Sequence, residues 1–205
     1  MGRVPSWEMS HYCVRCGTEL VTRVIEGHDL EACPNDDFVL WRDPKVASAV
    51  VVEVDGGVVL GRRAIEPGYG LWCLPGGFVN ADEHPAEAAV RECMEEISAA
   101  VELTSLIGVY HVPKQDAPSM VGIAYQARLV DGARLEPGVE MLEVGVFPID
   151  SIPPLAFPSH RYVLDEFLKS RASAEESPTQ RVAAGAQRET RPSPAQARPR
   201  PRRKP

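Results

Sequence analysis

Three carboxylates crowd together near the end of the stretch "PGGFVNADEHPAEAAVRECMEEI", which spans residues 75–97. Glu92, Glu95 and Glu96 stand at positions i, i+3 and i+4, so a helix would place them on one face. Like charges at this spacing repel one another, at a cost of roughly a few tenths of a kcal/mol per pair. A hard divalent cation such as Mg²⁺, which takes oxygen ligands, would offset that repulsion. The other interpretation is a solvated acidic face, and the helix alone leaves both open.

The helix that carries these carboxylates is predicted over residues 85–97. Pro85 suits its first turn, where the N–H that proline lacks has no intrahelical partner. An apolar stripe of the kind that faces a protein core runs along the helix and consists of Ala89, Val90, Cys93 and Ile97. The helix should therefore pack on a sheet, with the carboxylates at the wet edge of the contact.

Strands on both sides of this helix should supply that sheet. The stretch "KVASAVVVEVDGGVVLGRR" predicts two strands joined by a tight turn at Asp55-Gly56-Gly57, because these residues tolerate positive φ. A glycine-rich loop, "EPGYGLWCLPGGF", follows them. Further strands are expected at 101–112, 119–130 and 143–149, and a final helix from about 159 to 170. Alternating strands and helices predict an α/β domain.

The segment that begins at Gly77 resembles the Nudix box, G-x5-E-x7-R-E-U-x-E-E-x-G-U, where U is a bulky aliphatic residue. The first glycine, the arginine and all four glutamates stand at the spacings of that pattern. Ser98 replaces the last glycine, and Cys93 and Ala99 fill the two aliphatic positions. Serine ends a helix less well than glycine, so we expect Ser98 to affect local fit rather than activity. The resemblance implies a Nudix α/β/α sandwich with a mixed sheet.

The resemblance also implies a reaction and a set of site residues. Nudix enzymes bind Mg²⁺ or Mn²⁺ and hydrolyse a nucleoside diphosphate linked to another group. Divalent ions there neutralise pyrophosphate oxygens and lower the pKa of a bound water. The positions that match the catalytic and metal-binding residues of the family are Glu92, Glu95 and Glu96, with Arg91 as the orienting arginine, Glu83 as the upstream glutamate and the carbonyl of Gly76 as a further metal ligand.

Candidates outside the box each carry two interpretations. The general base is expected among Glu136, Glu140 and Glu143 in "LEPGVEMLEVGVF", although each of them also reads as a surface glutamate. Arg62 and Arg63 either contact phosphate or pair with the acidic surface. The remaining substrate-binding candidates are Gly76, Gly77 and Phe157.

Aromatic and cysteine side chains in the same region raise a similar choice. Phe157, in "LAFPSHR", either stacks on a base or closes the core, and the same alternatives hold for Tyr69 and Trp72. Cys73 and Cys93 are expected to be small buried residues rather than reactive thiols.

The N-terminal region carries a second metal-binding pattern. Cys13-x-x-Cys16-Gly is typical of a zinc knuckle, and its partner is expected at Cys33-Pro-Asn-Asp36, where Asp36 replaces the fourth cysteine. Carboxylates do ligate Zn²⁺, and His28 is an alternative fourth ligand. The other interpretation is a degenerate ribbon without metal. A unit of about 40 residues has too little core to fold well without such a staple.

Composition divides the chain into three parts: a zinc-ribbon-like element at 1–42, a Nudix domain at 43–171 and a Pro/Arg-rich tail at 172–205. The net charge is −7, but residues 171–205 hold nine Lys/Arg and three Glu, or +6, which leaves −13 for the rest. The tail has few large apolar residues and is expected to be disordered. The negative charge of the folded part disfavours binding of nucleic acid to it. Binding of nucleic acid through the basic tail is the less favoured alternative.

Two functions from different classes fit these observations. The first is a metal-dependent pyrophosphohydrolase acting on ADP-ribose, NAD(H), FAD or a similar small nucleotide, because a zinc ribbon before a Nudix domain resembles the subgroup that includes NADH pyrophosphatase. The second is a nucleotide-sensing or RNA-binding module without turnover. No run approaches the roughly 20 apolar residues of a membrane span, and the first residues lack the apolar stretch of a secretory signal, so we expect a cytoplasmic protein. A homodimer is expected from the resemblance alone.

Overall fold

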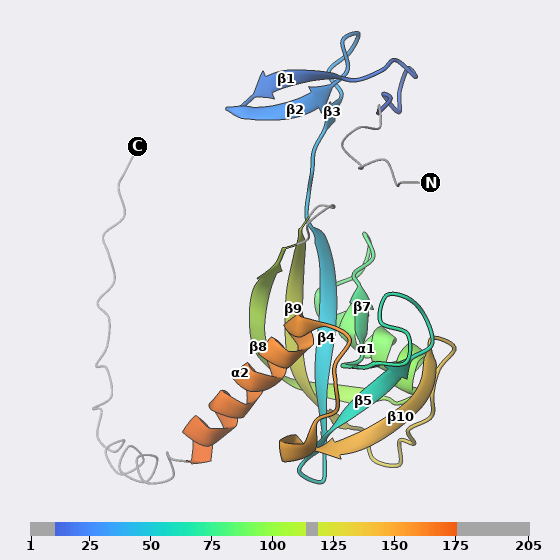
Figure 1. Ribbon diagram of the computed structural model, residues 1–205, viewed down its shortest axis with the longest axis vertical. Coiled ribbons are helices and arrows are strands. Elements are labelled where there is room, and N and C mark those ends of the chain that lie inside the picture. Colours follow the sequence, from blue (N-terminus) through green and yellow to red (C-terminus); the bar gives the residue numbers. More distant parts are fainter. Residues whose placement is uncertain (1–10, 114–118, 176–205) are drawn as a thin grey trace, which may run out of the picture. The chain divides into compact units, whose positions relative to one another are not determined.

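The computed structural model describes residues 11–113 and 119–175 (Figure 1). A three-stranded sheet comes first, with the order β1 (Val21–Ile25), β2 (His28–Ala32) and β3 (Val39–Leu40). A seven-stranded sheet follows, formed by β4 (Lys45–Val54), β5 (Gly57–Arg63), β6 (Trp72–Cys73), β7 (Gly76–Phe78), β8 (Val101–Val112), β9 (Met120–Leu129) and β10 (Met141–Pro148). The helices are α1 (Pro85–Ile97), the short 3-10 helix η2 (Ile149–Ser151) and α2 (Pro158–Glu175).

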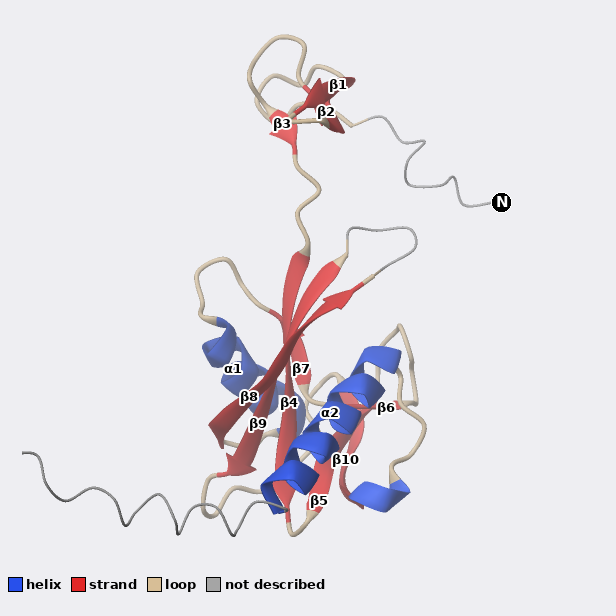
Figure 2. Cartoon of the chain, turned by 90° about the vertical axis from the view of Figure 1, so that its left-hand side faces the viewer, coloured by secondary structure: helices blue, strands red, loops and turns tan. Residues whose placement is uncertain are grey.

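The larger sheet is mixed, as predicted. Its order is β10-β5-β4-β9-β8, with β6 paired to β5 and β7 paired to β4. The β4–β9 pair is parallel and the others are antiparallel. Helices α1 and α2 lie on opposite sides of it (Figure 2). The expected α/β/α sandwich is therefore confirmed.

The turn between β4 and β5 lies where the Asp-Gly-Gly sequence predicted it. Val54 pairs with Gly57, and the two residues between them, Asp55 and Gly56, have φ of 49° and 79°. Two consecutive positive φ values match the right-handed twist of the flanking strands, which is why such sequences favour this hairpin. Val50, Val51 and Val52 in β4 are fully buried, as expected for a strand covered by helices on both sides.

Helix α1 packs on the sheet through Ala89, Cys93 and Ile97, which belong to one core cluster with Val50, Val52 and Val59. One predicted member of the stripe is wrong, because Val90 is 37% exposed while Ala88 is fully buried. Residues 88, 92 and 96 form a row of spacing i+4 beside the core row 89–93–97. The carboxylate row on that side is consequently drawn toward the interior, while Glu95 stands outside it.

Both ends of α1 are capped. His84 accepts a hydrogen bond from the Ala86 N–H at its Nδ1, and its own N–H donates to the Glu87 carboxylate, which closes a capping box. Ser98 ends the helix in the left-handed region, with φ of 53°, and its N–H donates to the Cys93 carbonyl. Serine thus adopts the conformation that the family pattern assigns to glycine.

The C-terminal part of the chain differs in detail from expectation. α2 continues to Glu175, beyond the predicted end near residue 170, so the expected start of the tail at 172 falls inside the helix. The compact unit that holds the sheet ends at Phe167, and of the unit from Leu168 onward the structure describes only the rest of α2. The expectation of disorder concerns residues that mostly lie outside the described part. None of the described helices is both long enough and apolar enough to cross a membrane.

Candidate active site

The carboxylate of Glu96 lies against the backbone of β7. Its Oε2 accepts a hydrogen bond of 2.8 Å from the Gly76 N–H, and the residue is only 4% exposed. Gly76 has φ of 155°, and a Cβ on it would lie 2.2 Å from the Ser48 carbonyl oxygen. Only glycine fits there, and its fit lets the helix bring a carboxylate onto the strand.

Glu92 sits one helical turn earlier and covers the next glycine. A Cβ on Gly77 would lie 2.4 Å from Glu92 Oε1, so the side chain rests directly on the backbone of β7. Burial raises the pKa of Glu92, although Arg91 opposes the shift. Gly76 and Gly77 therefore let the two inward-facing glutamates lie directly against the backbone of β7.

Arg91 links the other carboxylates. Its Nε and Nη2 donate to the two oxygens of Glu83 at 3.0 and 2.6 Å, and its Nη1 donates to Glu92 Oε1 at 2.8 Å and Glu95 Oε2 at 3.0 Å. The Nη2 also donates to the Phe78 carbonyl at 3.1 Å. These hydrogen bonds, with Glu83 as the strongest, raise the pKa of Arg91. A planar guanidinium suits this bidentate geometry, and the orienting role expected of Arg91 has a structural basis.

Glu83 is fully engaged in holding that arginine. Besides the two bonds from Arg91, it accepts the Asn80 N–H at 2.8 Å, and the Arg91 hydrogen bonds lower its pKa to about 2. Both oxygens of Glu83 are thus occupied by these donors, and Glu83 is not among the residues that line the pocket described below. In this structure Glu83 therefore holds the Arg91 guanidinium in place.

Arg91 leaves part of the acidic charge uncompensated. It engages one oxygen each of Glu92 and Glu95, and within the described chain Glu96 makes no ion pair. Burial raises the pKa of Glu96 to about 8, with the Gly76 N–H opposing and the Glu92 charge adding to the shift. Such a carboxylate favours a nearby cation, and a donor set made only of oxygens fits Mg²⁺ or Mn²⁺.

The three box carboxylates are not drawn into one tight cluster. A tight cluster would bring one ligand atom of each carboxylate within 4.8 Å of the others. In the described part of the chain, Glu92, Glu95 and Glu96 do not meet this distance together. Their helical rows explain this, because Glu92 and Glu96 turn inward while Glu95 is 58% exposed and pairs with Arg91. The inner pair is thus better placed to hold an ion than the outer glutamate.

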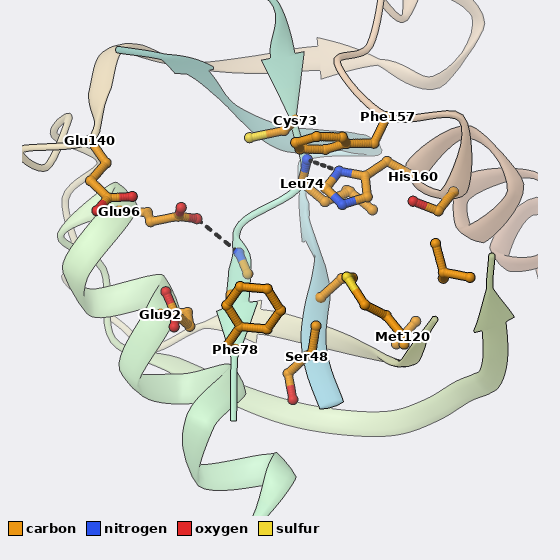
Figure 3. A pocket seen from close by; sticks show the side chains of 18 of the residues that line it. Ser48, Cys73, Leu74, Phe78, Glu92, Glu96, Met120, Glu140, Phe157 and His160 are labelled. Carbon is orange, nitrogen blue, oxygen red and sulfur yellow. Dashed lines mark hydrogen bonds between the residues drawn. The ribbon is translucent and has the colours of Figure 1, made fainter. Parts of the chain in front are cut away.

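These glutamates line one end of a pocket of about 910 Å³ (Figure 3). Glu140 lines it too, whereas the other two candidates for the base, Glu136 and Glu143, do not. The loop that carries Glu140 comes close to α1 because Gly138 has no side chain: its N–H donates to the Glu96 carbonyl at 2.9 Å, and a Cβ would overlap the Glu95 carbonyl oxygen.

The two arginines of β5 separate, as strand alternation requires. Arg63 is 8% exposed and lines the pocket, and its Nε donates to the Pro67 carbonyl at 2.8 Å. Arg62 lies outside the pocket lining and forms an ion pair of 3.6 Å with Glu143. Of the two interpretations offered for this pair, the phosphate contact suits Arg63 and the surface pairing suits Arg62.

The other end of the pocket is aromatic and apolar. Phe157 lines it, with the Arg63 guanidinium 5.0 Å from the ring centroid and the His160 ring edge-on at 5.0 Å (Figure 3). Sequence reasoning missed His160. Its position three residues after Phe157 at the start of a helix was the available signal, because i and i+3 share a helix face.

The remaining aromatic candidates lie outside the pocket lining, and the cysteine candidates are poor nucleophiles. Trp72 packs edge-on against Phe147 at 4.6 Å, Tyr69 is 58% exposed, and neither lines the pocket. Cys73 and Cys93 are buried, and burial raises the pKa of both thiols, to about 11 for Cys73. A thiol with a raised pKa is a poor nucleophile, in agreement with their expected passive role.

A second cluster of ligand atoms lies in the N-terminal element. Cys13, Cys16, Cys33 and Asp36 bring their ligand atoms within 4.8 Å of one another. Asp36 is held by the Phe38 N–H at 2.8 Å and approaches the Cys13 sulfur at 3.4 Å. His28 begins β2 and is not part of the group. Three sulfurs and one carboxylate are donors that Zn²⁺ accepts.

Comparison with known proteins agrees with this geometry. The NUDIX domain family matches residues 43–167, which is more than half of the chain. The chain belongs to the Nudix family. It is 30% identical over 154 residues to an ADP-ribose pyrophosphatase of Methanocaldococcus jannaschii, covering 75% of this chain and 87% of that relative.

Other Nudix proteins match over different extents. A NAD-capped RNA hydrolase NudC of Pseudomonas syringae pv. tomato is 27% identical over 85% of this chain, which spans 62% of that relative's length. The crystal structure of a Nudix hydrolase from Nitrosomonas europaea superposes with a TM-score of 0.71 at 34% identity, covering 79% of this chain and 92% of that one. The chain is a Nudix hydrolase of the pyrophosphohydrolase type, and these relatives leave its substrate to be assigned.

Proposed function

We propose that this Nudix protein uses Mg²⁺ or Mn²⁺ to hydrolyse the pyrophosphate bond of ADP-ribose or a closely similar nucleoside diphosphate derivative. The observation that carries the proposal is the buried carboxylate of Glu96. Within the described residues it forms no ion pair, and it lies at the acidic end of a pocket whose opposite end is aromatic. A nucleoside diphosphate derivative matches that polarity, since its pyrophosphate binds metal ions and its base presents a flat ring at one end.

The chain's own residues divide the work of such a reaction. Glu92 and Glu96 would hold the ion, with Glu95 at the rim. When bound there, such an ion would neutralise charge on the pyrophosphate and would lower the pKa of the attacking water. Arg91, anchored by Glu83, fixes the direction of the carboxylates. This arrangement keeps the ligand oxygens preorganised, which is the main protein contribution to phosphoryl transfer.

Two further pocket residues take parts in the proposed mechanism. Glu140 is the general base, because among the three glutamates considered it lines the pocket beside Glu96. It would accept the proton of the attacking water. With ADP-ribose as substrate, the water oxygen would bond to the phosphorus on the ribose side, the bond from that phosphorus to the bridging oxygen would break, and AMP and ribose 5-phosphate would leave. Arg63 presents a buried guanidinium on the pocket wall and would pair with a phosphate oxygen.

Size and kinship support a small nucleotide as substrate. A pocket of about 910 Å³ lies within the range of small-molecule sites, roughly 300–1,000 Å³. The relative from M. jannaschii bears the name ADP-ribose pyrophosphatase. We also propose that Cys13, Cys16, Cys33 and Asp36 hold a structural zinc ion in the N-terminal element. Retention of every box glutamate argues for turnover over pure sensing.

The test is a substrate panel assayed with Mg²⁺ and with Mn²⁺, comprising ADP-ribose, NADH, FAD and a NAD-capped RNA. We expect ADP-ribose to yield AMP and ribose 5-phosphate with the highest kcat/KM. Glu140→Gln should lower kcat at least a hundredfold, and the matched control Glu143→Gln, outside the pocket, should leave it within twofold. Tight nucleotide binding by the wild type without turnover of any substrate would favour the sensing module instead.

A further inference from the structure

His160 presents one ring nitrogen to the backbone and the other to the pocket. Its Nδ1 lies 3.0 Å from the Leu74 nitrogen and accepts that N–H (Figure 3). Leu74 precedes the box by three residues and lies 86 positions away in sequence, so the bond ties the start of α2 to the segment between β6 and β7. His160 itself lines the pocket beside Phe157.

This bond settles which nitrogen carries the proton. A backbone N–H only donates, so Nδ1 must be the unprotonated nitrogen, and a neutral imidazole then carries its hydrogen on Nε2. Burial and the neighbouring Arg63 guanidinium lower the pKa of His160 to about 4. The ring therefore stays neutral near pH 7, and the tautomer is fixed.

The Nε2–H has no partner within the described chain. Every sealed side-chain nitrogen or oxygen of the described residues has a hydrogen-bond partner, so a partnerless Nε2 is accessible from outside the core, and the side chain that carries it lines the pocket. Two contacts hold the imidazole ring in place: the hydrogen bond from the Leu74 N–H and the edge-on contact with the Phe157 ring, whose centroid lies 5.0 Å away. The donor consequently has a fixed direction, which is the property that distinguishes a recognition group from a mobile surface polar atom.

We infer that the Nε2–H of His160 reads a hydrogen-bond acceptor on the edge of the nucleobase that occupies the aromatic end of the pocket. This inference deepens the proposed function and rests on it for the kind of ligand. Phe157 offers a ring face or edge to any base, so aromatic contact tolerates every base. A fixed donor discriminates among bases, because a ligand without the acceptor leaves a desolvated N–H unpaired. His160 is thus a specificity-determining residue.

Two substitutions separate the bond to Leu74 from the pocket donor. His160→Asn places a carbonyl oxygen where Nδ1 lies and keeps an acceptor for the Leu74 N–H, but it is too short to present a donor at the Nε2 position. His160→Gln reaches the Nε2 position with an amide N–H but loses the acceptor for Leu74. A purely structural role predicts that Gln is the more harmful change, whereas base recognition predicts that Asn is.

The experiment measures binding of AMP, and of its 1-deaza, 3-deaza and 7-deaza analogues, by calorimetry to the full chain. AMP is the expected product and requires no turnover. We expect His160→Asn to weaken AMP binding about tenfold and His160→Gln to stay within about threefold. One analogue should bind the wild type about tenfold more weakly than AMP does, and should lose nothing further in His160→Asn, because both changes remove the same bond.

The outcomes separate this inference from the proposed function. If the wild type binds AMP and shows this pattern but hydrolyses nothing, the donor assignment stands and the enzyme proposal fails. Where ADP-ribose is hydrolysed, His160→Asn should raise KM about tenfold with kcat unchanged. Equal binding of all analogues by the wild type overturns the inference even if His160→Asn does not fold. It is also overturned by normal AMP binding in His160→Asn, or by no AMP binding in the wild type.

Discussion

Replacing Glu96 with glutamine should make the metal-free protein more stable at alkaline pH while removing its metal-dependent activity. The substitution keeps the shape of the side chain and removes its charge. In the structure the carboxyl is 4% exposed, its neighbours include the Glu92 charge, and its pKa is about 8 against an ordinary 4.5. The Gly76 N–H and the Arg63 charge offset only part of the desolvation penalty of this buried carboxylate, so removing its charge relieves the remainder.

The pH range follows from the direction of this shift. Below pH 4.5 the carboxyl is protonated in both folded and unfolded chains, and Glu96 adds no pH dependence. Between pH 4.5 and 8 the folded chain holds a proton that the unfolded chain has lost, so stability falls as pH rises. At about 1.4 kcal/mol per pH unit the loss amounts to on the order of 5 kcal/mol above pH 8. Relaxation and water entry would reduce that figure, so we expect about 3 kcal/mol or more.

The assay is urea unfolding in EDTA at a series of pH values from 5 to 9, for the wild type and Glu96→Gln. The wild-type free energy of unfolding should decline across this range and the variant's should decline less, so the two curves diverge toward pH 9. Mg²⁺ should restore the wild type at high pH by supplying the missing countercharge, with release of a proton near neutral pH. Parallel curves for the two proteins would show that the carboxyl is ionised at no cost, and the proposed metal site would lose its main support.

Three further predictions address the other parts of the site. Gly77→Ala should raise the Mg²⁺ concentration needed for half-maximal activity at least tenfold, because a Cβ there meets Glu92 Oε1 at 2.4 Å; an unchanged metal titration would remove Glu92 from the ligand set. Asp36→Cys should purify with at least as much zinc as the wild type and Asp36→Ala with less, measured as metal per chain; zinc-free protein in all three would establish a degenerate ribbon. The melting temperature should fall more steeply from pH 6.5 to 4 in the wild type than in His160→Gln, since the folded pKa of His160, about 4, lies below its ordinary 6.5; coincident curves would contradict a neutral buried ring.

Local patterns predicted the elements that position the site because each of them depends on neighbouring residues. The turn at Asp55-Gly56 needs two positive φ values, and helix α1 begins at the expected Pro85. The box spacing placed Glu92 and Glu96 on one row of the helix, and the structure buries that row beside the core. Periodicity misjudged Val90 because it assigns a stripe only to within one residue, and the tilt of the helix on the sheet decides the rest.

Features that depend on distant partners could not be predicted in this way. Arg62 and Arg63 are adjacent in sequence, and the face of β5 that turns toward the pocket is set by its pairing with other strands. The full engagement of Glu83 by Arg91 and Asn80 is likewise invisible in the motif. His160 meets Leu74 only because the start of α2 lies against the segment between β6 and β7, a contact that no local pattern encodes.

The places where ordinary folding rules are broken gather around one end of α1. A carboxylate that forms no ion pair in the described part of the chain is buried there, a serine replaces glycine in the left-handed region, and two glycines are required because side chains or carbonyls lie where a Cβ would be. Each feature costs stability compared with a conventional helix on a strand. A fold retains such costs where the strained arrangement is used. The proposed divalent cation would account for a buried carboxylate that has no ion-pair partner among the described residues, whereas a purely structural role for α1 would be served better by an alanine or a leucine at position 96.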